Sequence, residues 1–173
     1  MKPIEFIAKV APFAVSSMRE THVPASVTIA QAALESGWGE KAPGNNYFGI
    51  KGSGPAAQGL RHQIRAGQYR HGITPVPEGL QVFLTREYEG GVLVRIYDVF
   101  AAYPSPKESF DAHGRLLASR ERYAQAFQAT DGYGFARAVA DAGYATDPQY
   151  YDKLALLIRK YSLLEYDRLA RLP

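Results

Sequence analysis

The chain has 173 residues, about the length of one domain, and its 46% hydrophobic and 21% charged residues are typical of a folded globular protein. Its 20 basic and 17 acidic residues leave a net charge of only +3 with the cations dispersed, so the sequence does not favour nucleic acid as a partner. The absence of cysteine excludes disulfides and thiolate chemistry. We expect one domain over residues 1–173, acting as a monomer.

The N-terminal segment is expected to form a helix over residues 2–21, and Pro12 should kink it or split it in two. Glu5, Lys9 and Pro12 interrupt its apolar residues, so the segment does not have the pattern of a Sec signal peptide. No other stretch is apolar enough to predict a membrane span.

A second helix is expected from Pro24 to Ser36, because proline is favourable in a first turn and an amphipathic pattern follows. Its apolar stripe is formed by Val23, Val27, Ala30 and Leu34. Gly37 and Gly39 should end the helix, and a loop rich in Pro, Gly and Asn follows.

Glu35 stands at the end of this second helix, one turn from the indole of Trp38. The helix C-terminus and the nearby indole should both raise the pKa of its carboxyl group. A carboxyl that stays protonated near neutral pH suits a general acid that protonates a glycosidic oxygen. The alternative is a solvated surface charge without a role, which is the commoner fate of a glutamate at a helix end.

The middle of the chain changes character between residues 53 and 79, where glycine and proline recur and basic residues punctuate the segment, so we expect a loop with short strands. Residues 80–99 alternate in polarity around a Glu89–Gly91 turn, which predicts a β-hairpin. Together these residues should form a small β-lobe, over about residues 53–103.

The C-terminal part is expected to be helical over residues 106–118, 122–127, 134–142 and 148–161. Asp147 precedes Pro148 directly and is expected to be the N-cap of the last of these helices rather than a catalytic group. The order of helices, hairpin and helices predicts an α+β fold that is mainly α.

Cofactor chemistry is not indicated by the sequence. Its four histidines lie far apart, without the spacing of a metal site, so we expect no metal and no cofactor. Nucleophile-elbow, P-loop and dinucleotide-binding motifs are also missing.

Three strings carry a resemblance to a known family: ALESGWGEKAPGNNYFGIKG, LTREYEGG and AGYATDPQYYDKL. They resemble the glucosaminidase family typified by the peptidoglycan-hydrolysing domain of the flagellar rod protein, glycoside hydrolase family 73. The resemblance extends over roughly residues 30–52, 84–105 and 135–157. It implies a lysozyme-like fold, with a helical lobe and a small β-hairpin lobe around a groove.

The resemblance also implies roles for three residues. Glu35 matches the general acid, and Glu87 matches a second glutamate in a Thr-x-Glu-Tyr string, which favours it over Glu89. Tyr144 matches a tyrosine that lines the active site and would orient the N-acetylated sugar. Without the resemblance, Glu87 would be read as an exposed solubilising group, and Tyr144 as a core or helix-capping tyrosine.

Candidates for binding the sugars are Trp38, Asn46, Tyr47, Phe48 and Tyr103. Aromatic rings stack on pyranose faces, and an amide side chain can bond an N-acetyl group. Phe48 could equally pack beneath its loop, and Asn46 could equally hold the turn together.

The resemblance implies a peptidoglycan hydrolase that cleaves the β-1,4 bond after N-acetylglucosamine in wall glycan strands. Such an enzyme, made in the cytoplasm without a Sec signal, would reach the wall after lysis, as a phage endolysin does, or by dedicated export. The alternatives are a muramidase or lytic transglycosylase of the same fold, or a wall-binding module without turnover. Lysis, interbacterial attack and wall remodelling fit the sequence equally well.

Overall fold

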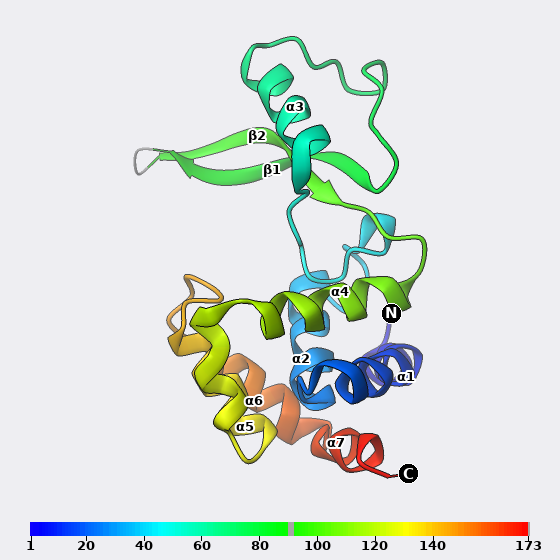
Figure 1. Ribbon diagram of the computed structural model, residues 1–173, viewed down its shortest axis with the longest axis vertical. Helices are drawn as coiled ribbons and strands as arrows, with labels where there is room; N and C mark the ends of the chain where they lie inside the picture. Colours follow the sequence, from blue (N-terminus) through cyan, green and yellow to red (C-terminus); the bar gives the residue numbers. More distant parts are fainter. Residues whose placement is uncertain (90–91, 173) are drawn as a thin grey trace.

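The structure is a computed structural model that describes residues 1–89 and 92–172, except for the side chains of residues 86–89 and 93. Figure 1 shows a lower lobe of helices and an upper lobe built on a β-hairpin. The helical lobe comprises α1 (Pro3–Thr21), α2 (Ala25–Ser36), α4 (Pro106–Ser119), α5 (Gly132–Asp141), α6 (Tyr150–Lys160), α7 (Leu164–Ala170) and the 3-10 helix η2 (Glu121–Gln128). The upper lobe comprises α3 (Gly54–Arg65), β1 (Leu80–Glu89) and β2 (Val92–Ala101).

Helix α1 is continuous through Pro12, so the predicted split does not occur. Its inward side chains, Phe6, Val10, Ala14 and Met18, all lie in the main hydrophobic cluster. Burial of these side chains outweighs the single backbone hydrogen bond that a proline removes.

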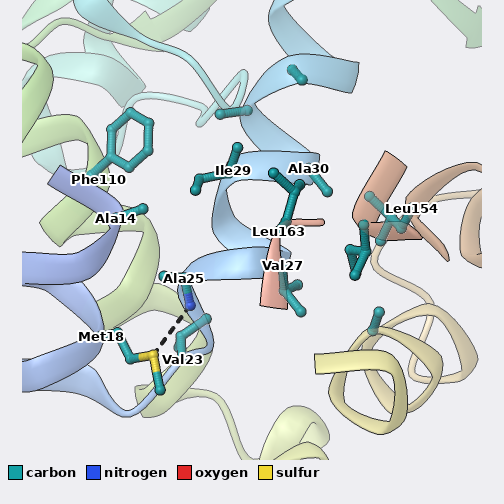
Figure 2. Packing of buried hydrophobic residues seen from close by; sticks show 14 of the residues in the cluster. Ala14, Met18, Val23, Ala25, Val27, Ile29, Ala30, Phe110, Leu154 and Leu163 are labelled. Carbon is teal, nitrogen blue, oxygen red and sulfur yellow. Dashed lines mark hydrogen bonds between the residues drawn. The ribbon is translucent and has the colours of Figure 1, made fainter. Parts of the chain in front are cut away.

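Helix α2 forms the centre of the helical lobe. The predicted stripe residues Val23, Val27 and Ala30 are buried as expected, and Leu34 packs against the core. Every other residue from Ala25 to Ala33 is buried too, so the helix is enclosed rather than amphipathic. Figure 2 shows why this is possible, with Val27, Ile29 and Ala30 meeting side chains from several elements. Small residues on α2 allow these neighbours to approach closely.

The first turn of α2 is capped from a distant helix. Asp167 of α7 accepts bonds from the Ser26 backbone N–H and the Ser26 hydroxyl, both at 2.7 Å. Gly132 borders this contact so closely that a Cβ there would lie 2.2 Å from the Ser26 Oγ. The sequence did not predict α7, which is only 7 residues long, yet it closes the N-terminal end of the central helix.

Helix α3 corrects the prediction of a loop with short strands for this region. Ser53 precedes the helix and Pro55 lies in its first turn. Ala57 and Leu60 pack against Val82 and Val99 of the hairpin, in a cluster separate from the main core. These tertiary contacts stabilise a helix whose glycines disfavour it locally.

Strands β1 and β2 are antiparallel and pair from Leu80 with Ala101 to Glu89 with Val92, as the hairpin prediction requires. The predicted turn residues Gly90 and Gly91 lie outside the described residues. The C-terminal helices appear where they were predicted, within a few residues at each end. No helix in the described part of the chain is long and apolar enough to cross a bilayer.

Candidate active site

Glu35 lies in the last turn of α2, where the helix leaves the core. Gly37, Trp38 and Gly39 follow with positive φ angles of 56°, 60° and 83°, which turn the chain sharply away from the helix axis. The helix on which Glu35 stands is buried, but Glu35 itself is exposed. A rigid element therefore presents one carboxyl group to solvent.

A hydrogen-bonded chain of side chains reaches Glu35 from the core. The Gln31 Nε2 donates to the Tyr150 hydroxyl at 3.0 Å, and that hydroxyl donates to the Glu35 Oε1 at 3.2 Å. Gln31 precedes Glu35 by one helical turn, so both project from the same face of α2. Tyr150 is buried and comes from the first turn of α6. The chain fixes one carboxyl oxygen and leaves the other, Oε2, for a different partner.

The pKa of Glu35 is raised above the usual value of a glutamate, because burial of its surroundings disfavours the charged form. The hydrogen bond from Tyr150 opposes this effect by stabilising the carboxylate. The predicted direction is therefore confirmed. The indole of Trp38 makes its ring contacts elsewhere, with Phe6 at 5.7 Å and Tyr161 at 5.3 Å between ring centroids.

Tyr144 lies beside this carboxyl group. Its ring stacks on that of Tyr150 with centroids 5.6 Å apart, and it also contacts the ring of Tyr123 at 6.2 Å. Burial, and then the charge of Glu35, raise the pKa of the Tyr144 phenol, so it stays protonated at neutral pH. The structure thus brings Glu35 and Tyr144 together across more than one hundred residues of sequence.

His113 lies beneath the tyrosine cluster and was not singled out by the sequence. Its ring stacks on Phe48 with centroids 3.9 Å apart and meets the edge of Tyr144 at 6.1 Å. It is fully buried, and burial lowers its pKa to about 3, so the ring is neutral. His113 therefore adds no charge beneath the site, and the local dielectric constant stays low.

Three of the predicted sugar-binding residues are buried. Tyr47 and Phe48 are both 5% exposed and pack against the ring of Phe110. Asn46 uses both ends of its amide within the protein: its Nδ2 donates to the Ile50 and Ala101 carbonyls at 2.9 Å, and its Oδ1 accepts from the Ile50 N–H at 3.0 Å. These contacts favour the alternatives of packing beneath the loop and holding the turn.

The other two predicted sugar-binding residues are half-buried. Trp38 packs over the start of α1, and Tyr103 follows β2, with its backbone N–H bonded to the Gly44 carbonyl at 2.8 Å. Burial raises the pKa of the Tyr103 phenol, and the nearby Arg115 opposes the rise. Each of these two rings keeps part of its surface open to a ligand.

Glu87 lies on β1 opposite Val94, and its side chain is outside the described residues. Asp147 is not the N-cap of the following helix, a position held by Gln149. Asp147 instead accepts from the Gln149 N–H at 2.9 Å and so stabilises the turn that leads into α6. In the part of the chain that the structure describes, no three His, Cys, Asp or Glu side chains are grouped as a metal site would require.

Residues 11–163 match the model of the glucosaminidase family, described as mannosyl-glycoprotein endo-β-N-acetylglucosaminidase. The chain belongs to this family. The family match includes both ends of the site, from the turn after α2 to the first turn of α6.

Two curated relatives show the same relationship. The peptidoglycan hydrolase FlgJ of Escherichia coli (strain K12) is 32% identical over 162 residues, which cover 90% of this chain and 45% of that protein. The exo-glucosaminidase LytG of Bacillus subtilis is 35% identical over 155 residues, which cover 84% of this chain and 47% of that protein. The chain therefore spans about half the length of these relatives.

Solved structures of similar sequence have the same fold. The catalytic domain of the autolysin Auto from Listeria monocytogenes has a TM-score of 0.73 at 31% identity, over 95% of this chain and 86% of that one. The peptidoglycan hydrolase from Sphingomonas sp. A1 has a TM-score of 0.65 at 30% identity, over 98% and 96%. The predicted lysozyme-like α+β fold, with a helical lobe and a two-stranded lobe, is confirmed.

Besides His113, sequence reasoning missed two site residues, Tyr150 and Gln31. Tyr150 stands inside the third family-like string, and its spacing with Leu154 and Ile158 places it on the inward face of α6. Gln31 stands one turn before Glu35, at a position that the helical period makes buried. A buried glutamine beside a candidate acid is a signal that a polar partner must be near.

Proposed function

We propose that this domain is a peptidoglycan hydrolase that cleaves the β-1,4 bond after N-acetylglucosamine, with Glu35 as the general acid. The observation that carries the proposal is geometric: an exposed carboxyl group at the end of the buried helix α2 is held at one oxygen by Tyr150, and its pKa is raised. Membership of the glucosaminidase family supports it, as do relatives that are named for peptidoglycan hydrolysis and exo-glucosaminidase activity.

In the proposed reaction, Glu35 gives its proton to the glycosidic oxygen as the bond to the sugar breaks. Tyr150 donates to Oε1, so the transferable proton resides on Oε2, which faces no donor among the described residues. When Glu35 becomes a carboxylate, the Tyr150 bond strengthens because the acceptor is then charged. The same bond thus orients the acid before transfer and stabilises its conjugate base afterwards.

Tyr144 is proposed to orient the N-acetylated sugar with its phenol. Its raised pKa keeps the hydroxyl protonated, so it can donate to a sugar or acetamido oxygen across the neutral range. Trp38 and Tyr103 are the candidates for contacts with neighbouring sugars, since both rings are only half-buried.

Glu87 is proposed to be the second carboxylate, which activates water or stabilises the oxocarbenium-like charge. Replacing Glu87 with Gln should lower turnover strongly, but leave more residual activity than the Glu35→Gln variant, because the substrate's acetamido group or a loosely held water can substitute. Glu89→Gln, two residues along β1, is the matched control. Full activity in Glu87→Gln with loss in Glu89→Gln would move the assignment to Glu89.

The experiment that tests the proposed function is digestion of purified sacculi by the domain, followed by reduction and mass spectrometry of the products. We expect new reducing ends on N-acetylglucosamine, within oligosaccharides of mixed length as an endo-acting enzyme produces. Reducing N-acetylmuramic acid would indicate a muramidase, and anhydro ends a transglycosylase. Binding to sacculi without any product would indicate a wall-binding module, and each of these three results would overturn the proposal.

A further inference from the structure

The segment from residue 41 to residue 77 has a charge pattern that the proposed reaction does not use. It contains no Asp or Glu, and its five cations are Lys41, Lys51, Arg61, Arg65 and Arg70. Figure 1 places α3 and the loop after it beyond the hairpin, at the end of the molecule away from α7. This half of the β-lobe is therefore basic, whereas the whole chain is close to neutral.

A pocket of about 360 Å³ opens between the C-terminal half of α3 and strand β2. Its lining combines charged and apolar groups: Arg61, Ile64, Arg65, Ile96, Tyr97 and Asp98. The pocket belongs to the smaller hydrophobic cluster, since Ile64 and Tyr97 pack at its edge. It is thus a feature of the β-lobe itself, distinct from the Glu35 site.

Arg61 is held rigidly at the wall of this pocket. Its Nε donates to the Asp98 Oδ1 at 3.0 Å, and its Nη2 donates to the Gly52 and Val99 carbonyls at 2.9 Å. Its Nη1 has no acceptor among the residues that the structure describes. A guanidinium group fixed on one edge and open on the other is preorganised to bind an anion.

Asp98 does not cancel the positive charge of the pocket. Lys51 bonds its Oδ2 at 2.6 Å, and Arg61 and the Val99 N–H bond its Oδ1, so its carboxylate is already paired twice. Arg65 stands one helical turn after Arg61 and is exposed, and its side chain has no hydrogen bond or ion pair with any described residue. Among the residues that line the pocket, Arg61 and Arg65 against Asp98 leave an excess of positive charge.

We propose that this pocket binds a carboxylate of the peptide stems of the wall polymer, an inference that rests on the proposed function. The open edges of Arg61 and Arg65 match the two oxygens of a carboxylate. The side chains of Ile64, Ile96 and Tyr97 offer apolar contact to the small side chains of such a peptide. The occupant is thus a carboxylate at a peptide end, rather than a sugar of the glycan strand.

The position of the pocket determines which step it affects. Because α3 lies beyond the hairpin, the stem held there belongs to a neighbouring part of the polymer rather than to the sugar beside Glu35. Holding a neighbouring stem anchors the enzyme on its polymer without changing the reacting geometry. The pocket should therefore lower KM for intact wall and leave kcat unchanged.

The test is Arg65→Gln in an inactive Glu35→Gln background, with binding to insoluble sacculi measured by co-sedimentation. We expect about fivefold weaker binding to sacculi with intact stems, since one exposed charge-assisted contact is lost. Glycan strands freed of their stems by an amidase no longer sediment, so they are attached to beads for the same assay, and they should bind both proteins equally. Arg168→Gln, the same charge change on an exposed residue of α7, is the control and should bind like the parent. Equal binding of the Arg65 variant and its parent to intact sacculi would overturn the proposal.

Two further measurements separate this inference from its rivals. Sacculi stripped of phosphate polymers by hydrofluoric acid should still distinguish the Arg65 variant from its parent; loss of the difference would mean that phosphate is the ligand. In the active protein, Arg65→Gln should raise KM on sacculi with kcat unchanged, whereas a lower kcat would contradict the anchoring role. A wild type that cleaves no glycan but still shows the Arg65 difference would refute the proposed reaction and leave the stem site standing.

Discussion

A carboxyl group lies at each end of helix α2, Asp167 of α7 at one end and Glu35 of α2 itself at the other, and the two have different surroundings. Asp167 at the N-terminal end is 6% exposed and accepts two bonds from Ser26. Glu35 at the C-terminal end is exposed and accepts one bond, from Tyr150. Burial raises the pKa of both groups. The helix dipole favours a negative charge at the first end and disfavours it at the second.

This comparison shows that a raised pKa alone does not make a catalytic acid. Both oxygens of Asp167 are occupied and enclosed, so its proton has no route to a substrate. Glu35, whose pKa is also raised, keeps one oxygen free on an exposed surface. Accessibility, and not the direction of the pKa shift, therefore distinguishes the enclosed carboxyl of Asp167 from the carboxyl that is proposed to react.

The largest expected effect comes from exchanging each carboxyl for its amide. Glu35→Gln should lower turnover on sacculi at least about 100-fold, because the amide keeps the volume and loses the transferable proton. Asp167→Asn should stay within about threefold of wild type once folded, since an amide can still bond Ser26. Turnover of purified, folded protein is the measurement. Glu35→Gln activity within about tenfold of wild type, about 1.4 kcal/mol in barrier, would remove Glu35 as the acid.

The second effect concerns stability and should appear at the other end of α2. Asp167→Ala should lower the free energy of unfolding by about 2–3 kcal/mol, because it removes a helix cap and leaves buried donors of Ser26 without a partner. A fall in Tm of about 5–10 °C would be measured by calorimetry. Glu35→Gln is the control and should not lower the Tm. An unchanged Tm in Asp167→Ala would show that α7 does not stabilise α2 through this contact.

The third prediction separates two roles of Tyr150, its hydrogen bond to Glu35 and its packing against Tyr144. Tyr150→Phe keeps the ring stacked on Tyr144 but removes the donor to the carboxyl, so activity should fall about tenfold. The alkaline limb of the activity profile should also move to higher pH, because the lost bond had favoured the charged form of Glu35.

The control for this variant is Tyr151→Phe, the next residue on α6, whose ring lies under the guanidinium of Arg137. It should show neither change. Lower activity of Tyr150→Phe with an unmoved alkaline limb would assign Tyr150 to substrate binding instead.

The smallest effect is the dependence of stability on pH. Because the folded pKa of each carboxyl lies above its unfolded value, the folded protein holds more protons than the unfolded chain between those values. The stability that these protons contribute is present below the unfolded pKa and is lost as pH rises through the folded pKa. Asp167→Asn should reduce the dependence of the free energy of unfolding on pH more than Glu35→Gln does. The reason is that Glu35 is exposed and its charge is screened by solvent. The reverse order, in unfolding at several pH values, would contradict the comparison.

The sequence predicted the Glu35 end of α2 well, because its signals are local. Gly37 and Gly39 mark the end of the helix, and the turn glycines with alternating residues mark the hairpin. The family resemblance identified Tyr144 as a candidate site residue, and the structure stacks its ring on that of Tyr150. Helix boundaries and one catalytic candidate therefore followed from short windows of sequence.

The remaining features depend on contacts between distant residues. Helix α3 forms because Ala57 and Leu60 meet the hairpin, and no local pattern shows this. The bond from Tyr150 to Glu35 spans 115 residues, and the Asp167 cap spans 141. The buried positions of Tyr47 and Phe48 depend on Phe110 in the same way, so aromatic side chains in a loop could not be assigned to core or groove from sequence.

The separate hydrophobic cluster of the β-lobe has an evolutionary consequence. Ala57, Leu60, Val82 and Val99 stabilise this lobe without sharing a side chain with the main cluster. Substitutions and insertions there should combine almost independently with changes around Glu35. Under the proposed function, descendants of one ancestral glucosaminidase domain can acquire different wall preferences by remodelling the residues around α3, while the proposed acid at the end of α2 remains unchanged.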